Sequence, residues 1–286
     1  MTVRRRKKKS LLSDQGQADP FDFDVSGYPP LPRLPGLFIT GTDTGVGKTL
    51  IAGAICRVLG EGGLRVEPFK PVATGCRRTR EGLVSPDSEF LAACADSLRP
   101  LRQITPLRFK AAVAPNVAAC YEHKAVELEA IFDEYRRLEG SADMVIVEGV
   151  GGLLCPLSDD FWVIHLARMM MLPVVIVARA GLGTINHTLL TIQVARQAGL
   201  LIAGVVVNRY RLEPETGHKT QGPDQHESHG DDDLAICTNL QQLAQRGKVP
   251  LLAIVPDEPS NSVERATLGP DTLFAVRQVN WPDLAR

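Results

Sequence analysis

Short apolar runs along the chain alternate with stretches in which apolar residues recur every three or four positions. Continuous apolar runs are typical of strands buried on both faces of a sheet, and the other spacing places apolar side chains along one face of a helix. Together they predict an α/β fold, a doubly wound, mostly parallel sheet with helices on both faces. Strands are predicted at 37–41, 64–70, 144–147, 174–177, 201–207 and 249–255, and helices at 48–60, 85–94, 124–138, 184–199 and 233–246.

Several stretches interrupt this pattern. Residues 1–35 are charged and then proline-rich, which predicts a disordered or extended leader ahead of a single domain at 36–286. Residues 104–120 are alanine-rich and broken by proline, which predicts a loop over the edge of the site. Residues 211–233 are polar and predict a mobile surface insertion. The chain after the last predicted strand is expected to be mostly irregular, with one short helix.

The stretch 41–49 reads Gly-Thr-Asp-Thr-Gly-Val-Gly-Lys-Thr and lies between the first predicted strand and the first predicted helix. This is the context of a phosphate-binding P-loop, whose backbone N–H groups and helix N-terminus attract phosphate oxygens. Lys48 would reach the β- and γ-phosphates of a nucleotide, and the Thr49 hydroxyl would bind Mg²⁺. The common spacing places glycine where this chain has Thr42, so the loop is a variant. The alternative is an ordinary strand–turn–helix corner.

Polar side chains stand at the ends of three predicted strands. Ligands bind beyond this edge of a doubly wound sheet, so Lys70 is a candidate to neutralise a second phosphate or a carbamate. Glu148 ends an apolar run and precedes glycines, an arrangement in which a carboxylate holds Mg²⁺ directly or through water. The amide of Asn208 could read the edge of a base. The alternatives are a solvated lysine, an exposed glutamate and a turn asparagine.

Ser85 and Asp87 stand at the start of a predicted helix, where either could be the N-cap. From the residues alone, N-capping is the favoured role of Asp87, because serine, threonine, aspartate and asparagine side chains accept hydrogen bonds from the first turn.

Composition narrows the class of protein. The formal net charge of -1 gives no general attraction to nucleic acid or membranes, and no apolar run approaches the roughly 20 residues of a spanning helix. The basic stretch 4–9 lacks the apolar region of a signal peptide and is read as a solvated tail. Six scattered cysteines without a C-x-x-C pair suit a reducing cytoplasm. The histidines of 211–233 match no known metal-ligand spacing.

These motifs, in this order, resemble those of dethiobiotin synthetase, a ligase family of biotin biosynthesis. The resemblance implies a P-loop NTPase-like fold and a cytoplasmic homodimer without nucleic-acid or membrane partners. The family uses ATP, Mg²⁺ and CO₂ or bicarbonate to close a cyclic urea on 7,8-diaminopelargonic acid. The resemblance covers about 36–260 and rests on 41–49, on Lys-Pro-Val-Ala-Thr-Gly at 70–75, on 147–152, on Leu-Gly-Thr-Ile-Asn-His at 182–187 and on 207–208.

The resemblance also implies roles for individual residues. Lys48 and Lys70 would be catalytic, and Thr44, Lys70 and Thr74 would bind diaminopelargonic acid. Mg²⁺ would be held by Thr49, Asp87 and Glu148, which overrules pure N-capping by Asp87. Ala114-Pro115-Asn116 departs from the family pattern, so substrate contacts there are left open. ATP would be bound by Thr44, Gly45, Val46, Gly47, Lys48, Thr49, Asp87, Glu148, Gly149, Val150, Gly151, Asn208, Arg209, Pro256, Asp257 and Glu258.

Two other classes of protein remain as alternatives. Switch ATPases of the partition or septum-positioning type carry a signature lysine in the loop, where this chain has Asp43, and often an amphipathic membrane helix that is not apparent here. Cobyrinate-type amidotransferases carry an appended glutaminase domain, for which we expect no room after residue 250. The chemistry implied by the resemblance needs no covalent enzyme intermediate, in agreement with a sequence that shows no Ser/His/Asp or Cys/His signature.

Overall fold

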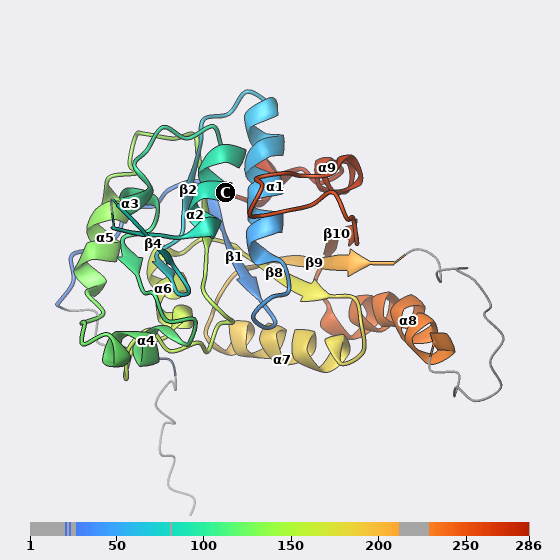
Figure 1. The fold of residues 1–286 in the computed structure, drawn as a ribbon. Coiled ribbons are helices and arrows are strands. Elements are labelled where there is room, and N and C mark those ends of the chain that lie inside the picture. The colour runs from blue at the N-terminus through green and yellow to red at the C-terminus, as the bar shows by residue number, and fades with distance from the viewer. Residues whose placement is uncertain (1–20, 22, 24–26, 81, 212–228, 286) are drawn as a thin grey trace, which may run out of the picture.

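A six-stranded parallel sheet forms the centre of the molecule (Figure 1). The computed structural model describes residues 21, 23, 27–80, 82–211 and 229–285. The strand order is β10-β9-β8-β1-β7-β2, which confirms the predicted doubly wound fold. The strands are β1 Gly36–Gly41, β2 Val66–Phe69, β7 Met144–Glu148, β8 Val174–Arg179, β9 Ile202–Tyr210 and β10 Leu251–Pro256.

Both faces of the sheet are buried, because successive residues of its strands enter two different hydrophobic clusters. In β1, Leu37 and Ile39 belong to one cluster and Phe38 belongs to the other. In β8, Val175 and Val174 divide in the same way. Side chains of a strand alternate between faces, so a strand that is apolar at every position requires cover on both sides. This explains why the predicted strands read as continuous apolar runs.

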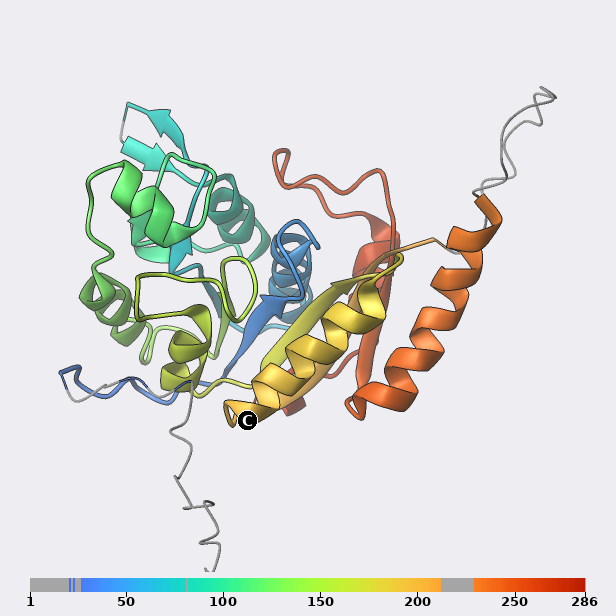
Figure 2. The same ribbon diagram turned by 90° about the horizontal axis from the view of Figure 1, so that it is seen from below.

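Helices supply this cover on each face (Figures 1 and 2). The cluster containing Leu37 is completed by side chains of α1, α2, α9 and α10. The cluster containing Phe38 is completed by α4 to α8. The helices are α1 Lys48–Glu61, α2 Pro86–Cys94, α4 Pro115–Tyr121, α5 Leu128–Arg136, α6 Val163–Met170, α7 Thr184–Gln197, α8 His229–Gly247, α9 Pro270–Arg277 and α10 Trp281–Leu284.

Two small sheets lie beside the end of β2. The pair β3 (Val72–Ala73) and β6 (Leu107–Arg108) is parallel, and β4 (Arg77–Thr79) and β5 (Gly82–Val84) form an antiparallel hairpin. The stretch predicted as a loop at 104–120 therefore contains β6 and most of α4, and it begins at the end of α3 (Leu101–Ile104). Its proline explains the error, because Pro115 occupies the first turn of α4, where a proline is tolerated.

Part of the predicted leader packs against the domain. Phe21 is buried beside α6 and α7, and Phe23 lies edge-on to Phe161. Tyr28 packs edge-on against Phe132 of α5, and Leu31 is buried in the cluster that contains Phe38. Residues 21, 23 and 27–35 contain no helix or strand, and their aromatic and aliphatic side chains cover one end of the core. The remaining residues of 1–35 lie outside the described part.

Two further boundaries differ from prediction. The insertion predicted at 211–233 ends earlier, because α8 begins at His229; residues 212–228, with His218 and His226, lie outside the described part. The C-terminal region contains two helices, α9 and α10, where one was predicted. Both begin with proline in the first turn, and Trp281 of α10 is buried in the core.

Candidate functional site

The carboxyl ends of the parallel strands open into a pocket of about 700 Å³. Such ends meet at one edge of a doubly wound sheet, which is where ligands bind in this architecture. The loop after β1, the ends of β2, β7 and β9, the start of α2 and the segment after β10 all contribute to its walls. Residues widely separated in the sequence are thereby gathered around one space.

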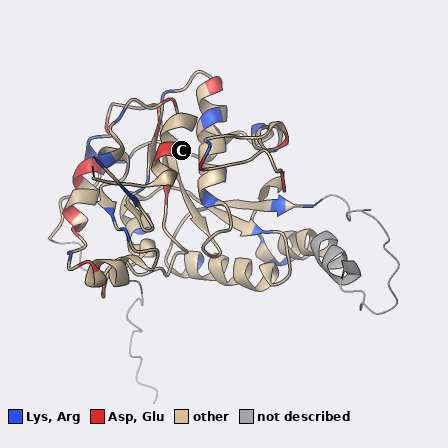
Figure 3. Ribbon diagram, viewed as in Figure 1, with Lys and Arg blue, Asp and Glu red and all other residues tan. Residues whose placement is uncertain are grey.

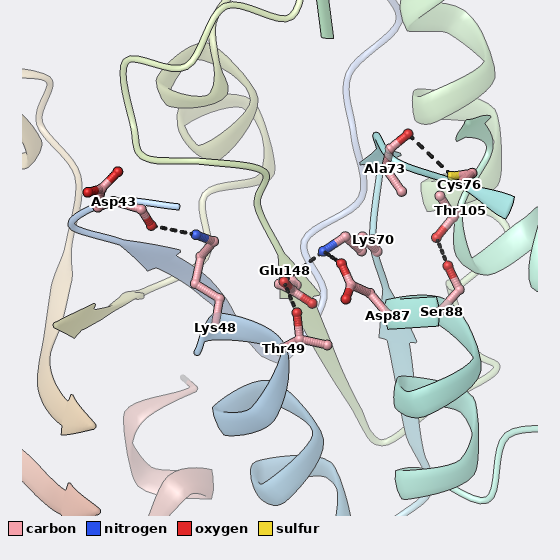
Figure 4. Close-up of polar contacts among 10 residues, drawn as sticks. All are labelled: Asp43, Lys48, Thr49, Lys70, Ala73, Cys76, Asp87, Ser88, Thr105 and Glu148. Atoms are coloured by element: carbon pink, nitrogen blue, oxygen red, sulfur yellow. Dashed lines mark hydrogen bonds and ion pairs between the residues drawn. The ribbon is translucent and has the colours of Figure 1, made fainter. Parts of the chain in front are cut away.

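The glycine-rich loop wraps the N-terminus of α1. Gly45 and Gly47 have positive φ angles of 75° and 95°, which residues other than glycine rarely adopt. Lys48 begins α1 and donates a 2.8 Å hydrogen bond from Nζ to the carbonyl oxygen of Asp43 (Figure 4). The ammonium group therefore lies over the loop that precedes it. Burial lowers the pKa of Lys48 below its usual value, against the opposing influence of Glu148.

Four polar side chains form a network beside Lys48 (Figure 4). They are Thr49, Lys70, Asp87 and Glu148. Nζ of Lys70 lies 2.6 Å from Oδ2 of Asp87 and 2.7 Å from Oε1 of Glu148. The same Oε1 accepts a 2.8 Å hydrogen bond from Oγ1 of Thr49. Lys70 and Glu148 are 4% and 1% exposed, so the two charges compensate each other away from water. The ends of β2 and β7 and the starts of α1 and α2 are thus joined at one point.

Electrostatics keep Lys70 charged. Burial by itself would lower the pKa of Lys70, but the carboxylates of Glu148 and Asp87 outweigh burial and raise that pKa above its usual value. A fixed ammonium group in a buried setting can stabilise negative charge without reorganising during a reaction. The arrangement therefore suits the neutralisation of an anionic group that enters from the pocket.

Asp87 is not the N-cap that the residues alone favoured. Ser85 occupies the N-cap position of α2, and Asp87 lies in the first turn. Its carboxylate contacts Lys70, which is distant in sequence, and its side chain is 35% exposed toward the pocket. Local sequence could not reveal this pairing, because it depends on how α2 packs against the end of β2.

Asn208 is fully buried beneath the loop. Its Nδ2 donates a 2.9 Å hydrogen bond to the carbonyl oxygen of Val46, and its Oδ1 has no hydrogen-bond partner among the described residues. A Cβ atom at Gly47 would lie 2.0 Å from Nδ2, so glycine is required for this approach. One N–H of Nδ2 is engaged by Val46, whereas Oδ1 is unused, so this oxygen can accept a hydrogen bond from a bound molecule.

The structure brings the site residues expected from the sequence into one pocket, with one exception. Val46 points its side chain into the core, where it is 3% exposed, and contributes its carbonyl oxygen to Asn208. Five of the nine pocket residues that were not predicted from the sequence follow Glu258, after the last strand. Their turn-forming composition gave no signal that they would face the pocket. Pocket residues that were missed are Leu50, Gly75, Ser85, Pro86, Pro259, Asn261, Ser262, Val263 and Glu264.

The oxygen atoms around Glu148 fit a hard divalent cation. The described residues contain no cluster of three or more His, Cys, Asp or Glu side chains suited to a metal, so the candidate set is two carboxylates and the Thr49 hydroxyl. Oε2 of Glu148 is buried without a hydrogen-bond partner in the described structure. A buried carboxylate oxygen with an unused lone pair is an appropriate Mg²⁺ ligand, and Mg²⁺ prefers such oxygen donors. These residues therefore fit the ion.

The surface carries charges of both signs, interspersed over the described helices and loops in the view of Figure 3. This distribution accords with the formal net charge of -1.

None of the described helices is long and apolar enough to cross a bilayer. Cys56, Cys76, Cys94, Cys120 and Cys155 are free cysteines.

Comparison with known proteins identifies similar chains. A family model described as an AAA domain matches residues 35–265. The ATP-dependent dethiobiotin synthetase BioD of Anaeromyxobacter dehalogenans is 38% identical over 234 residues, which span 82% of this chain and 95% of the relative. The protein of the same name from Bacillus subtilis is 38% identical over 185 residues, which span 65% of this chain and 79% of the relative.

Among solved structures, the MinD cell division protein of Aquifex aeolicus is similar in fold. The TM-score is 0.51 at 13% sequence identity, over 85% of this chain and 95% of that chain. At this identity the likeness shows a shared fold alone, because one fold supports many unrelated activities.

Proposed function

Since this chain belongs to the family of ATP-dependent dethiobiotin synthetases, we propose that it closes the cyclic urea of dethiobiotin on 7,8-diaminopelargonic acid, using CO₂ and ATP. The enzyme is a ligase that acts in biotin biosynthesis. The observation that carries the proposal at the level of residues is the position of Lys70, whose ammonium group contacts Glu148 and Asp87 beside a P-loop.

The reaction begins with a carbamate, which one amine of the substrate forms with CO₂. A carbamate oxygen attacks the γ-phosphate of ATP, and ADP leaves with the electron pair of the broken bond. The second amine then attacks the carbonyl carbon of the mixed anhydride, which closes the ring and releases phosphate. Each step moves negative charge near the phosphoryl group, so fixed cations are the main requirement.

The chain offers two lysines for this purpose, on opposite sides of Glu148 (Figure 4). Lys48, at the start of α1, is suited to the β- and γ-phosphates. Lys70, at the end of β2, is suited to the carbamate and the phosphoryl group during transfer. Thr74 also lines the pocket on this side, where its hydroxyl is suited to the substrate together with Thr44 and Lys70. We assign these as the substrate-binding groups.

We propose that Thr49, Asp87 and Glu148 hold Mg²⁺. When bound, the ion would supply Lewis-acid stabilisation of charge on the phosphates of ATP. Support comes from the unused Oε2 of Glu148 and from the convergence of the Thr49 hydroxyl on the same carboxylate.

At the other end of the pocket, we propose that Asn208 selects adenine. The buried Oδ1 has no partner among the described residues and is suited to accept a hydrogen bond from the exocyclic amine of adenine, whereas the carbonyl oxygen of guanine has no proton to donate to it. The loop after β10, with Pro256, Asp257 and Glu258, would flank the base and ribose, and Gly45, Gly149, Val150, Gly151 and Arg209 also lie in the pocket wall.

We also propose that the enzyme is a cytoplasmic homodimer. The free cysteines of the described residues accord with a reducing compartment. Light scattering across a concentration series measures the oligomeric state directly, and a monomer at all concentrations would refute the dimer.

ATP turnover with different stimulants separates this function from its rivals. We expect turnover to depend on 7,8-diaminopelargonic acid, with DNA, lipid vesicles and glutamine having no effect. An analogue with one of the two amines provides the matched control, because it can form a carbamate but cannot close the ring. Stimulation by DNA or lipid would instead support the septum-positioning class, and stimulation by glutamine would support an amidotransferase.

A further inference from the structure

The segment that connects β10 with α9, residues 256–269, forms one wall of the pocket, and we refer to it as the strap. It consists of turns and an isolated bridge between Ser262 and Thr267. Backbone hydrogen bonds, such as the pair between Ser262 and Thr267, shape its turns, and side chains of the strap contact α9. The strap residues in the pocket wall are Pro256, Asp257, Glu258, Pro259, Asn261, Ser262, Val263 and Glu264.

The strap lies at the nucleoside end of the pocket. It follows β10, at the edge of the sheet opposite to β2, where Lys70 lies, and β10 is the neighbour of β9, which carries Asn208. The P-loop follows β1 in the middle of the sheet. A nucleotide whose phosphates lie on the P-loop therefore extends its ribose and base toward β9 and the strap.

Glu258 attaches the strap to the N-terminus of α9. Oε2 of Glu258 accepts a 2.9 Å hydrogen bond from the backbone N–H of Thr272, and Oε1 accepts a 2.9 Å hydrogen bond from the hydroxyl of Ser260. A Cβ atom at Gly269 would lie 1.9 Å from this carboxylate, so glycine is needed for the approach. Burial alone would raise the pKa of Glu258, but these hydrogen bonds outweigh it and lower the pKa below its usual value.

Asn261 makes a second attachment at the same place. Its Nδ2 donates to Oγ1 of Thr272 at 2.8 Å, and its Oδ1 accepts from the backbone N–H of Gly269 at 2.8 Å. Gly269 is the N-cap residue of α9, and as a glycine it has no side chain with which to cap the helix. Helix α9 is therefore capped by side chains from the strap, and the strap is fixed by the helix.

Helix α9 is in turn fixed to the P-loop helix. Val276 is fully buried in the same cluster as Ile51 and Ile55 of α1, and Arg277 forms a 2.6 Å ion pair with Glu61 at the end of α1. Helix α9 therefore contacts both the strap and helix α1, which begins with Lys48. A change at the cap of α9 would move the strap relative to the phosphate site.

We propose that Glu258 is a positioning residue for nucleotide binding, which caps α9 and thereby holds the strap against the base and ribose of ATP. The proposal rests on the proposed function, because ATP is taken as the nucleotide. It assigns the carboxylate of Glu258 to the helix rather than to a direct contact with ATP. The loss of this contact should therefore weaken binding of the nucleoside and spare binding of the phosphates.

Calorimetry on Glu258→Gln tests this separation with two ligands, ATP and inorganic tripolyphosphate, in the presence of Mg²⁺ and without diaminopelargonic acid. Tripolyphosphate has no base or ribose. We expect ATP affinity to fall about tenfold, the usual effect of losing a charge-assisted hydrogen bond. Tripolyphosphate should bind as it does to the unaltered enzyme. In turnover assays the KM for ATP should rise while kcat is retained.

Two further variants complete the test. Asp271→Asn removes an equal charge from the exposed first turn of α9 without touching the strap, and it should bind both ligands normally. Asn261→Ala removes the second attachment and should reproduce the selective loss of ATP, so the test survives if Glu258→Gln fails to fold. An equal loss of both ligands, a lowered melting temperature with unchanged ATP affinity, or a matching loss in Asp271→Asn would each overturn the proposal. These binding measurements need no ring closure, so their outcome is independent of whether dethiobiotin is formed.

Discussion

Thr49 and Glu148 are 99 positions apart in the chain, yet Oγ1 of Thr49 donates a 2.8 Å hydrogen bond to Oε1 of Glu148. The same oxygen accepts from Nζ of Lys70 at 2.7 Å. One buried carboxylate oxygen therefore links the P-loop helix to the end of β2. The other oxygen of Glu148 has no partner in the described structure and remains available to a cation.

Replacement of Lys70 by glutamine should impair chemistry more than ATP binding. In the proposed mechanism, Lys48 serves the β- and γ-phosphates, and Lys70 acts on the carbamate and the phosphoryl group during transfer. An interaction that is stronger in the transition state than in the ground state affects kcat rather than affinity. We expect single-turnover ring closure to slow about 10²–10³-fold, with ATP affinity nearly unchanged.

The matched control for Lys70 is Lys110→Gln, because Lys110 is an exposed lysine outside the pocket wall. It should behave as the unaltered enzyme in both assays. If Lys70→Gln loses ATP affinity as much as it loses rate, Lys70 is an ordinary nucleotide contact and its catalytic assignment is wrong.

Replacement of Thr49 by valine should raise the Mg²⁺ concentration required for half-maximal turnover. Valine has nearly the same shape but lacks the hydroxyl that donates to Glu148, so the proposed Mg²⁺ site would lose one ligand. A tenfold increase is expected, at about 1.4 kcal/mol per tenfold. A Mg²⁺ titration of ATP turnover measures the shift, with Thr191→Val, on α7 outside the pocket wall, as the control. An unchanged Mg²⁺ requirement would remove Thr49 from the metal site.

Replacement of Asn208 by alanine should reduce the preference for ATP over GTP. The variant lacks the buried Oδ1 that is suited to the amine of adenine, and it also lacks the hydrogen bond to Val46. We expect the ratio of ATP to GTP affinity to fall about tenfold, because one unmade hydrogen bond is worth roughly that amount. Equal losses for both nucleotides would mean that Asn208 supports the loop and does not read the base.

Deletion of residues 1–30 should lower the melting temperature. It removes Phe21, Phe23 and Tyr28, which pack on α5, α6 and α7. Burial of one large apolar side chain contributes about 1.5–3 kcal/mol, and about 1 kcal/mol moves the melting temperature of a domain of this size by 2–4 °C. Deletion of 1–20 alone is the control and should have little effect. Equal melting temperatures for the two truncations would show that the aromatic contacts contribute nothing measurable.

The site residues that could be predicted from the sequence either belong to a local motif or stand at the end of a predicted strand. Lys48 and Thr49 belong to a contiguous loop motif, and Lys70 and Glu148 each end an apolar run. Parallel strands bring such ends together without further information. The doubly wound sheet was predictable for the same reason, since its buried strands are apolar at every position.

The parts that escaped prediction depend on contacts between distant segments. Asp87 resembled a helix cap because nothing near it in sequence indicates that Lys70 lies 2.6 Å away. The strap resembled an irregular tail, although Glu258 fixes it to Thr272 at a separation of 14 residues. The charges and prolines of residues 1–35 do not indicate that Phe23 packs against Phe161. Composition does not encode such pairings.

Ring closure with ¹³C-labelled bicarbonate shows directly whether the enzyme forms dethiobiotin. The enzyme is mixed with 7,8-diaminopelargonic acid, ATP, Mg²⁺ and the labelled bicarbonate, and the product is analysed by mass spectrometry beside phosphate release. We expect dethiobiotin labelled at the ureido carbon, with phosphate released in equal amount, and a rate about 10²–10³-fold lower for Lys48→Ala. ATP consumption without a labelled ring, or a Lys48→Ala variant as active as the unaltered enzyme, would contradict it.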